Sequence, residues 1–156
     1  MFRILEREQF IYNSANFPVY IGKGKISDFP NYAALCHWHD DLEFSVLLSG
    51  NMEYNVNGEV VKIQEGEGIF INTRQLHYNY SQSKKDCRYL CVLVHPMLLC
   101  TSPLVEQDYV APLLTNHAYP YQALRSDSVW GQKICRNLKK IDECRDNPLL
   151  IQAAFF

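Results

Sequence analysis

The sequence predicts a mainly β domain, a barrel or a sandwich, followed by α-helices towards the C-terminus. From about Phe17 to His95, short apolar and β-branched runs are separated by turn signals about every 8–12 residues, which is the spacing of all-β domains. Asn57-Gly58 is the strongest two-residue hairpin signal, because both positions tolerate positive φ. Beyond Ser126, apolar residues recur at helical spacing instead.

The strands follow from the alternation of apolar and polar residues. Alternation over residues 42–49 predicts a half-buried strand, and residues 52–56 alternate again before the hairpin at Asn57-Gly58. Val60 to Ile63 form the return strand, which ends at the turn around Gly66. A short apolar strand over 69–71 follows. In the strand over 87–95, Val92-Leu93-Val94 is expected to be buried on both faces.

Past Pro96 the pattern changes, which divides the chain into three parts. Residues 1–96 are expected to form the barrel, residues 97–125 an irregular connection broken by prolines, and residues 126–156 a helical segment. Ser126-Asp127-Ser128 offers an N-cap, and Asn147-Pro148 starts a second helix. Because that helix has barely begun at Phe156, we expect a truncated chain. One apolar stripe on the first helix is the expected dimerisation face: Trp130, Ile134, Leu138 and Ile141.

Composition excludes several classes of protein. The chain has 156 residues, 47% hydrophobic and 21% charged, as expected for one globular domain. A formal net charge of −2 argues against direct nucleic-acid binding, which usually needs a dense basic face. The sequence has neither a signal-peptide pattern nor a long apolar stretch, so we expect a cytoplasmic protein without membrane contact. Its six cysteines include no CxxC pair and are expected to be reduced thiols rather than ligands of a zinc ribbon.

One cluster of residues carries the chemical signal. His37 and His39 are two apart, so on a strand they share a face, and Glu43 follows four residues later. A third imidazole, His77, comes after two hairpins. Three nitrogens and one carboxylate could hold a divalent transition metal such as Zn, Ni, Fe or Mn.

The segment from His37 to Gly50 reads H-x-H-x3-E-x6-G and resembles the first motif of the cupin superfamily. Gly66 and His77 stand at the two ends of a segment that resembles the second motif. Three positions depart from the family pattern: Asn31 and Arg74 replace glycines, and Asn72 replaces a proline. The resemblance implies a cupin (jelly-roll) β-barrel followed by C-terminal α-helices, with His37, His39, Glu43 and His77 at the positions of the metal ligands.

Within the cupins, the chain is more similar to the N-terminal domain of AraC-like regulators, over about residues 15–156. The similarity lies in His37-Trp38-His39-Asp40, Leu42-Glu43, Leu48-Ser49-Gly50, Glu65-Gly66-Glu67, Leu76-His77 and Val110-Ala111-Pro112-Leu113. It implies a bacterial domain that senses a small-molecule effector, such as a sugar, and dimerises in the full-length protein. DNA would be bound only by a C-terminal helix-turn-helix domain that lies outside this chain.

Effector contacts are expected from His37, His39, Glu43 and His77, with Arg74 and Tyr78 as further candidates. A metal is not required by this interpretation, because the cluster can be an inherited barrel feature held by hydrogen bonds. Catalysis is not expected. Two alternatives stay open: a stand-alone metal-dependent cupin enzyme, either a dioxygenase or an isomerase, and a metal-independent carbohydrate-binding module.

Overall fold

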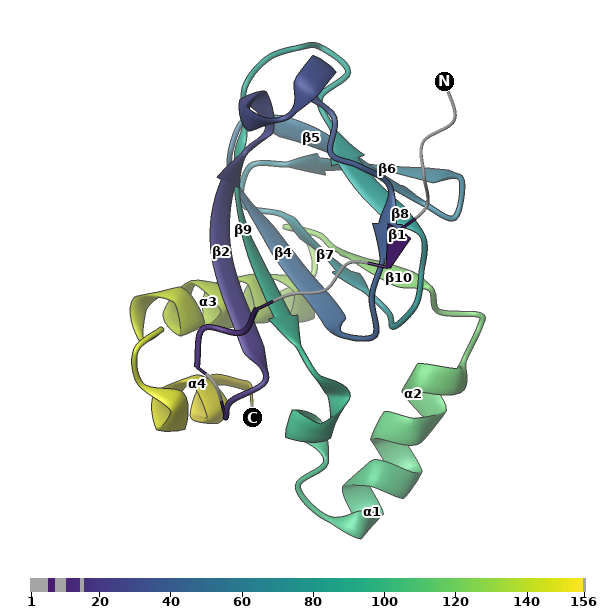
Figure 1. The fold of residues 1–156 in the computed structure, drawn as a ribbon, viewed down its shortest axis with the longest axis vertical. Coiled ribbons are helices and arrows are strands. Elements are labelled where there is room, and N and C mark those ends of the chain that lie inside the picture. Colours follow the sequence, from purple (N-terminus) through teal and green to yellow (C-terminus); the bar gives the residue numbers. More distant parts are fainter. Residues whose placement is uncertain (1–5, 8–10, 15, 156) are drawn as a thin grey trace.

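The computed structural model describes residues 6–7, 11–14 and 16–155, and its core is a barrel of two facing β-sheets (Figure 1). The first sheet has the order β1 (Glu6–Arg7), β3 (His37–Trp38), β8 (His77–Tyr80), β5 (Asn51–Val56) and β6 (Glu59–Gln64). The second has the order β10 (Tyr121–Leu124), β7 (Gly68–Ile71), β4 (Leu42–Ser49), β9 (Arg88–Val94) and β2 (Val19–Lys25). All pairings are antiparallel except that of β1 with β3. The mainly β prediction is therefore confirmed.

The hairpin between β5 and β6 forms where the sequence predicts it. Asn57 and Gly58 have φ of 52° and 92°, and Val56 pairs with Glu59 across the turn. Positive φ at both central residues matches the right-handed twist of the two strands, which is why Asn-Gly is favoured there.

Strand β4 is buried on both faces, so the prediction of a half-buried strand was wrong. Leu42 and Val46 belong to an apolar cluster shared with the C-terminal helices, whereas Leu47 belongs to the cluster inside the barrel. Glu43 and Ser45, which alternate with them, are only 6% and 2% exposed. The alternation on β4 therefore separates an inner face, which carries the polar Glu43 and Ser45, from an apolar outer face that the helices cover.

Two helices, α3 (Val129–Glu143) and α4 (Pro148–Phe155), cover that outer face (Figure 1). Both predicted caps are present: the Ser128 hydroxyl accepts a hydrogen bond from Gly131 N at 3.1 Å, and Asn147 Oδ1 accepts one from Leu150 N at 3.2 Å. These bonds satisfy backbone donors that the first helical turn leaves without partners.

The apolar stripe of α3 packs mainly on its own barrel. Leu138 and Ile141 are 2% and 1% exposed and lie in the core with β4 and β9, and Ile134 is packed against the same cluster. Trp130, in contrast, is 72% exposed. In this packing Leu138 and Ile141 have no surface to offer a second subunit, so of the four expected dimer contacts Trp130 is the most accessible.

Residues 97–125, expected to be irregular, contain more order than the prolines indicate. An arm over residues 103–115 consists of α1 (Pro103–Val105), a π-helical turn (Glu106–Val110) and α2 (Ala111–Thr115), and it extends away from the barrel (Figure 1). The chain then returns as β10, which pairs with β7 at the edge of the second sheet. Strand β10 was missed because four residues carry little local signal, and its conformation depends on a partner about 50 residues earlier.

Among the described residues, no helix combines the length and the apolar character needed to cross a bilayer.

Candidate functional site

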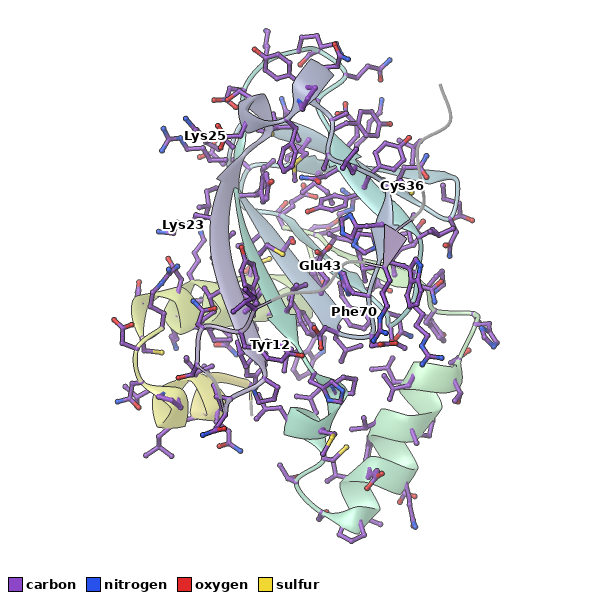
Figure 2. The ribbon with its side chains drawn as sticks, in the orientation of Figure 1. Tyr12, Lys23, Lys25, Cys36, Glu43 and Phe70 are labelled. Atoms are coloured by element: carbon purple, nitrogen blue, oxygen red, sulfur yellow. The ribbon has the colours of Figure 1, made fainter. Side chains whose placement is uncertain are left out.

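The four residues singled out by spacing come together at one end of the barrel. His37 on β3 pairs directly with His77 on β8, and His39 follows at the end of the same segment. Glu43 approaches from β4 in the opposite sheet and lies between the two sheets (Figure 2). One potential ligand atom from each residue lies within 4.8 Å of those of the other three. His39, Glu43 and His77 are buried, and His37 is half-buried.

Each imidazole is oriented by a backbone carbonyl. The Nδ1 atoms of His37, His39 and His77 lie 2.8, 2.9 and 2.7 Å from the carbonyl oxygens of Leu35, Asp41 and Gln75. A carbonyl oxygen can only accept, so each Nδ1 carries the proton and donates it. In the neutral tautomer this leaves the lone pair on Nε2, which is the arrangement found in metal-bound histidines.

Glu43 lies between two of these rings. Its Oε1 is 3.8 Å from His39 Nε2, and its Oε2 is 3.4 Å from His77 Nε2. Burial alone would raise the pKa of Glu43, but His77 and His39 outweigh it and hold this pKa well below its usual value. Burial likewise acts to lower the pKa of His39, but the neighbouring Glu43 carboxylate outweighs it and raises this pKa. The site therefore holds a carboxylate anion in a largely water-excluded place.

These residues fit a divalent metal ion. The Nε2 atom of His77 is buried and makes no hydrogen bond of normal geometry with any described residue, which is costly unless another partner is bound. Three imidazole nitrogens and one carboxylate form a donor set suited to Zn, Ni, Fe or Mn. A His/Glu group that could hold a metal is thus present in the fold.

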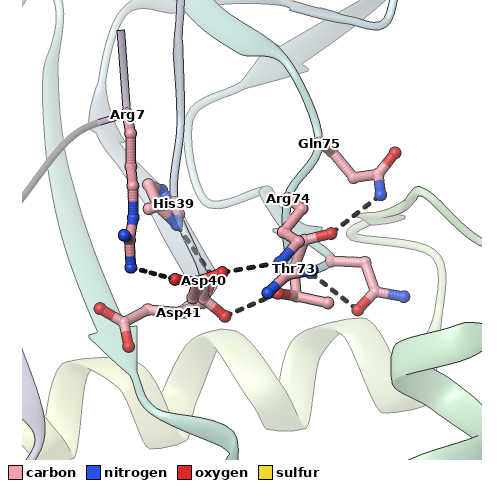
Figure 3. A network of polar contacts seen from close by, with 8 residues as sticks. Arg7, His39, Asp40, Asp41, Thr73, Arg74 and Gln75 are labelled. Atoms are coloured by element: carbon pink, nitrogen blue, oxygen red, sulfur yellow. Dashed lines mark hydrogen bonds and ion pairs between the residues drawn. The ribbon is translucent and has the colours of Figure 1, made fainter.

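The rim beside this cluster is tied together by Asp40 (Figure 3). Its carboxylate accepts hydrogen bonds from the Arg7 guanidinium and from Arg74 Nε, the latter at 2.7 Å. The backbone N–H of Arg74 donates to the carbonyl of His39 at 2.8 Å. Arg74 is therefore close to the cluster through its backbone, while its side chain pairs with Asp40.

Two of the residues that differ from the cupin pattern have positive φ angles. Asn31 and Arg74 stand where the family usually has glycine, and their φ angles are 57° and 61°. This left-handed region favours glycine, and asparagine enters it more easily than arginine does. The backbone at both positions thus keeps a conformation that favours glycine, although both residues carry side chains.

Tyr78, expected among the effector contacts, lies on the other face of its strand. On β8 the buried residues are His77 and Asn79, which alternate with Tyr78 and Tyr80. The two tyrosine rings, 5.5 Å apart, instead line an open groove of about 480 Å³ together with Asn31, Lys84 and neighbouring residues. Strand alternation places this groove away from His77.

Two contacts of the site were missed by sequence reasoning. Cys91 on β9 donates to Glu43 Oε1 at 3.4 Å, and Tyr12 donates to Asp41 Oδ1 at 2.9 Å. The sequence contains no local signal for either contact, because each joins residues that lie more than 28 positions apart.

Comparison with known proteins agrees with this geometry. The cupin domain family model matches residues 30–93, which include all four residues of the cluster. The fold is therefore a cupin-type barrel followed by C-terminal helices. Two solved structures are similar to about half of the chain: a Cupin 2 conserved barrel domain protein from Salinispora arenicola (14% identity, 55% of this chain, 70% of that chain, TM-score 0.46) and salicylate 1,2-dioxygenase from Pseudaminobacter salicylatoxidans (18% identity, 51% of this chain, 23% of that chain, TM-score 0.45).

A curated relative is similar over most of the chain. The uncharacterized HTH-type transcriptional regulator YdeC of Bacillus subtilis is 30% identical over 132 residues, which cover 85% of this chain. The match includes only 45% of that protein, so the chain spans less than half the length of its relative.

Proposed function

We propose that this chain is the effector-sensing domain of an AraC-like bacterial transcription regulator. The observation that carries the proposal is the similarity to an HTH-type regulator over 85% of this chain, which includes helical segments as well as the barrel. In the whole protein a further domain would bind DNA, consistent with the net charge of −2 on this one. The AraC assignment itself rests on the motif resemblance.

The effector, a small molecule such as a sugar, would bind at the barrel end that carries His37, His39, Glu43 and His77. We further propose that these four side chains can hold a divalent transition metal. The three oriented imidazoles and the buried carboxylate support this. A bound metal would supply a Lewis acid for an oxygen atom of the effector. Arg74 and Asp40 would shape the rim past which the effector enters.

Strand β4 offers a physical route from the site to the helices. Glu43 faces the histidines of the candidate site. Its neighbours Leu42 and Phe44 point the other way and pack in the apolar core that contains Leu138 and Ile141 of α3. A small displacement of β4 on effector binding would therefore act directly on α3. Helix position would in turn set the spacing of two DNA-binding units in a dimer. If the effector binds one helix arrangement more tightly than the other by about 1.4 kcal/mol, the ratio of the two arrangements shifts tenfold.

The decisive test of the regulatory assignment is the parent gene beyond the codon for Phe156. A continuation of roughly 100 residues, basic and with two helix-turn-helix patterns, would support it. Crosslinking of the full-length protein with and without effector then tests the mechanism. An identical dimer geometry in both states would refute transmission through the helices.

A metal-dependent cupin enzyme is the second candidate. It is favoured by the same four ligand atoms, because three nitrogens and one carboxylate leave coordination positions open for a substrate. A stop codon directly after Phe156 would move this candidate to first place. Substitution His39→Ala separates the two by turnover: an enzyme would lose its metal and its turnover, whereas a sensor has no turnover to lose and would lose effector affinity together with any bound metal.

A further inference from the structure

Cys91 lies on the inner face of β9, beside the carboxylate of the candidate site. Strands β9 and β4 pair so that Cys91 is opposite Ser45, two residues along the strand from Glu43. Residues two apart on a strand share a face, so Cys91 and Glu43 are diagonal neighbours inside the barrel. The Cys91 thiol donates a hydrogen bond to Glu43 Oε1 at 3.4 Å.

The carboxylate of Glu43 needs such a partner to keep its orientation. Rotation about the last bond of a glutamate has a broad profile, so local contacts decide where the two oxygens point. Oε2 is directed to His77 Nε2 at 3.4 Å, whereas Oε1 is 3.8 Å from His39 Nε2, beyond hydrogen-bond distance. The Cys91 thiol thus donates a hydrogen bond to Oε1, and it approaches from the barrel interior rather than from the imidazoles.

Two phenols lie near this pair and stay neutral: Tyr54, which is buried, and Tyr89, which is half-buried. Burial raises the pKa of Tyr89 to about 12 and, together with the Glu43 charge, raises the pKa of Tyr54 well above its usual value. The surroundings of Glu43 on this side therefore include two uncharged phenols beside the Cys91 thiol. A second observation points to a ligand at the same place, since His77 Nε2 is buried without a hydrogen bond to any described residue.

We propose that Cys91 is a positioning residue of the metal site: its thiol holds Glu43 Oε1 so that the carboxylate faces the three imidazoles. The inference rests on the metal-binding part of the proposed function. Residues that orient a metal ligand through a hydrogen bond typically contribute about 10- to 100-fold to metal affinity. A serine at position 91 also donates a hydrogen bond, whereas an alanine does not.

The test is a titration of the metal-free protein with Co²⁺, followed by its visible absorption, and with Zn²⁺ in competition with a chromophoric chelator. We expect Cys91→Ala to lower the affinity for both metals about 10- to 100-fold. The metal affinity of Cys91→Ser should stay within a few-fold of the wild type. Cys87→Ala is the matched control, because Cys87 is a buried thiol in the apolar cluster inside the barrel. It should bind both metals like the wild type.

Three outcomes would overturn the assignment. Equal metal affinity of Cys91→Ala and wild type would show that the thiol does not position Glu43. An equal loss of metal affinity in Cys91→Ala and Cys87→Ala would show a general effect of packing inside the barrel. A thiolate-to-Co²⁺ charge-transfer band in the near ultraviolet that is absent from Cys91→Ser would show that Cys91 is itself a ligand.

Crystal structures of metal-free wild type, Cys91→Ala and Cys91→Ser separate this inference from the proposed metal site. If the wild type binds neither metal, metal binding fails, but the carboxylate orientation still decides the role of Cys91. A rotated Glu43 carboxylate in the alanine variant, restored in the serine variant, supports the positioning role. An unchanged carboxylate in both variants refutes it.

Discussion

Arg74 adopts a left-handed backbone conformation, with φ of 61°, while its side chain donates to Asp40 at 2.7 Å. The backbone conformation favours glycine, and the ion pair favours arginine. The side chains of Arg74 and Asp40 are 73% and 29% exposed, so solvent screens their attraction. The left-handed strain at position 74 thus destabilises the fold, whereas the screened ion pair stabilises it only weakly.

Two substitutions at this position separate those contributions. Both Arg74→Ala and Arg74→Gly remove the ion pair, but only glycine relieves the left-handed strain. We expect the glycine variant to be more stable than the alanine variant by about 1 kcal/mol, measured by urea denaturation. Equal stabilities would contradict the left-handed conformation at position 74.

The ion pair between Lys23 and Asp142 predicts a pH dependence. Lys23 Nζ on β2 lies 2.8 Å from Asp142 Oδ2 on α3. Burial alone would raise the pKa of Asp142, but Lys23 and Arg145 outweigh it and hold this pKa below its usual value of 3.8. A carboxyl group with a lowered folded-state pKa stabilises the fold above its unfolded pKa, and this contribution is lost as the pH falls through the folded value.

We therefore expect Asp142→Asn to lower the free energy of unfolding at neutral pH, by about 0.2–1 kcal/mol given the exposed lysine. The difference from wild type should shrink once the pH falls below 3.8. Urea denaturation at neutral pH and at about pH 3 measures both values. A difference that persists unchanged in acid would show that the charge of Asp142 is not involved.

Asn72 connects the barrel to the helical arm by hydrogen bonds. Its buried Nδ2 donates to the carbonyls of Leu113 at 2.8 Å and Tyr119 at 3.1 Å. Asn72→Ala leaves both carbonyls without this donor, so we expect a loss of about 1–3 kcal/mol and faster amide hydrogen exchange over residues 111–121. Gln122→Ala, which changes an exposed amide on β10, is the control and should leave exchange unchanged. Unaltered exchange in Asn72→Ala would show that the arm is held by other contacts.

Substitutions on helix α3 show whether its apolar stripe stabilises the fold or a dimer. Leu138→Ala and Ile141→Ala should each lower the free energy of unfolding by about 2–5 kcal/mol, because each leaves a cavity in a packed core. Trp130→Ala should change it little, since that side chain is 72% exposed. Thermal unfolding over a range of protein concentrations gives the measurement. Losses at Leu138 or Ile141 that depend on concentration would show that these residues also act between subunits.

Part of the fold followed from local sequence alone. The Asn57-Gly58 hairpin and the caps at Ser128 and Asn147 formed as predicted, because turns and helix starts depend on φ preferences and hydrogen bonds within a few residues. The spacing of the His/Glu motif likewise indicated the candidate site. His37 lies on the short strand β3 and His39 directly after it, and strand pairing brings His77 opposite His37.

Other features were beyond the reach of local patterns. Alternation along β4 showed that Glu43 and Ser45 share a face, but not that this face is the barrel interior, since that depends on which surface the helices cover. Alternation also places Tyr78 opposite to His77, but the groove beside Tyr78 is completed by Asn31, which lies far away in the sequence. Strand β10 and the burial of Leu138 depend on partners far away in the chain.

The sequence by itself determined the mainly β class, the turns, the helix starts and the four residues of the candidate site. Only the tertiary structure decided which face of each element is buried, that Arg74 pairs with Asp40, and that Cys91 donates to Glu43. The physical reason is that strand pairing and helix packing join residues across long sequence separations. Their register is selected by the burial of the whole core rather than by any local preference.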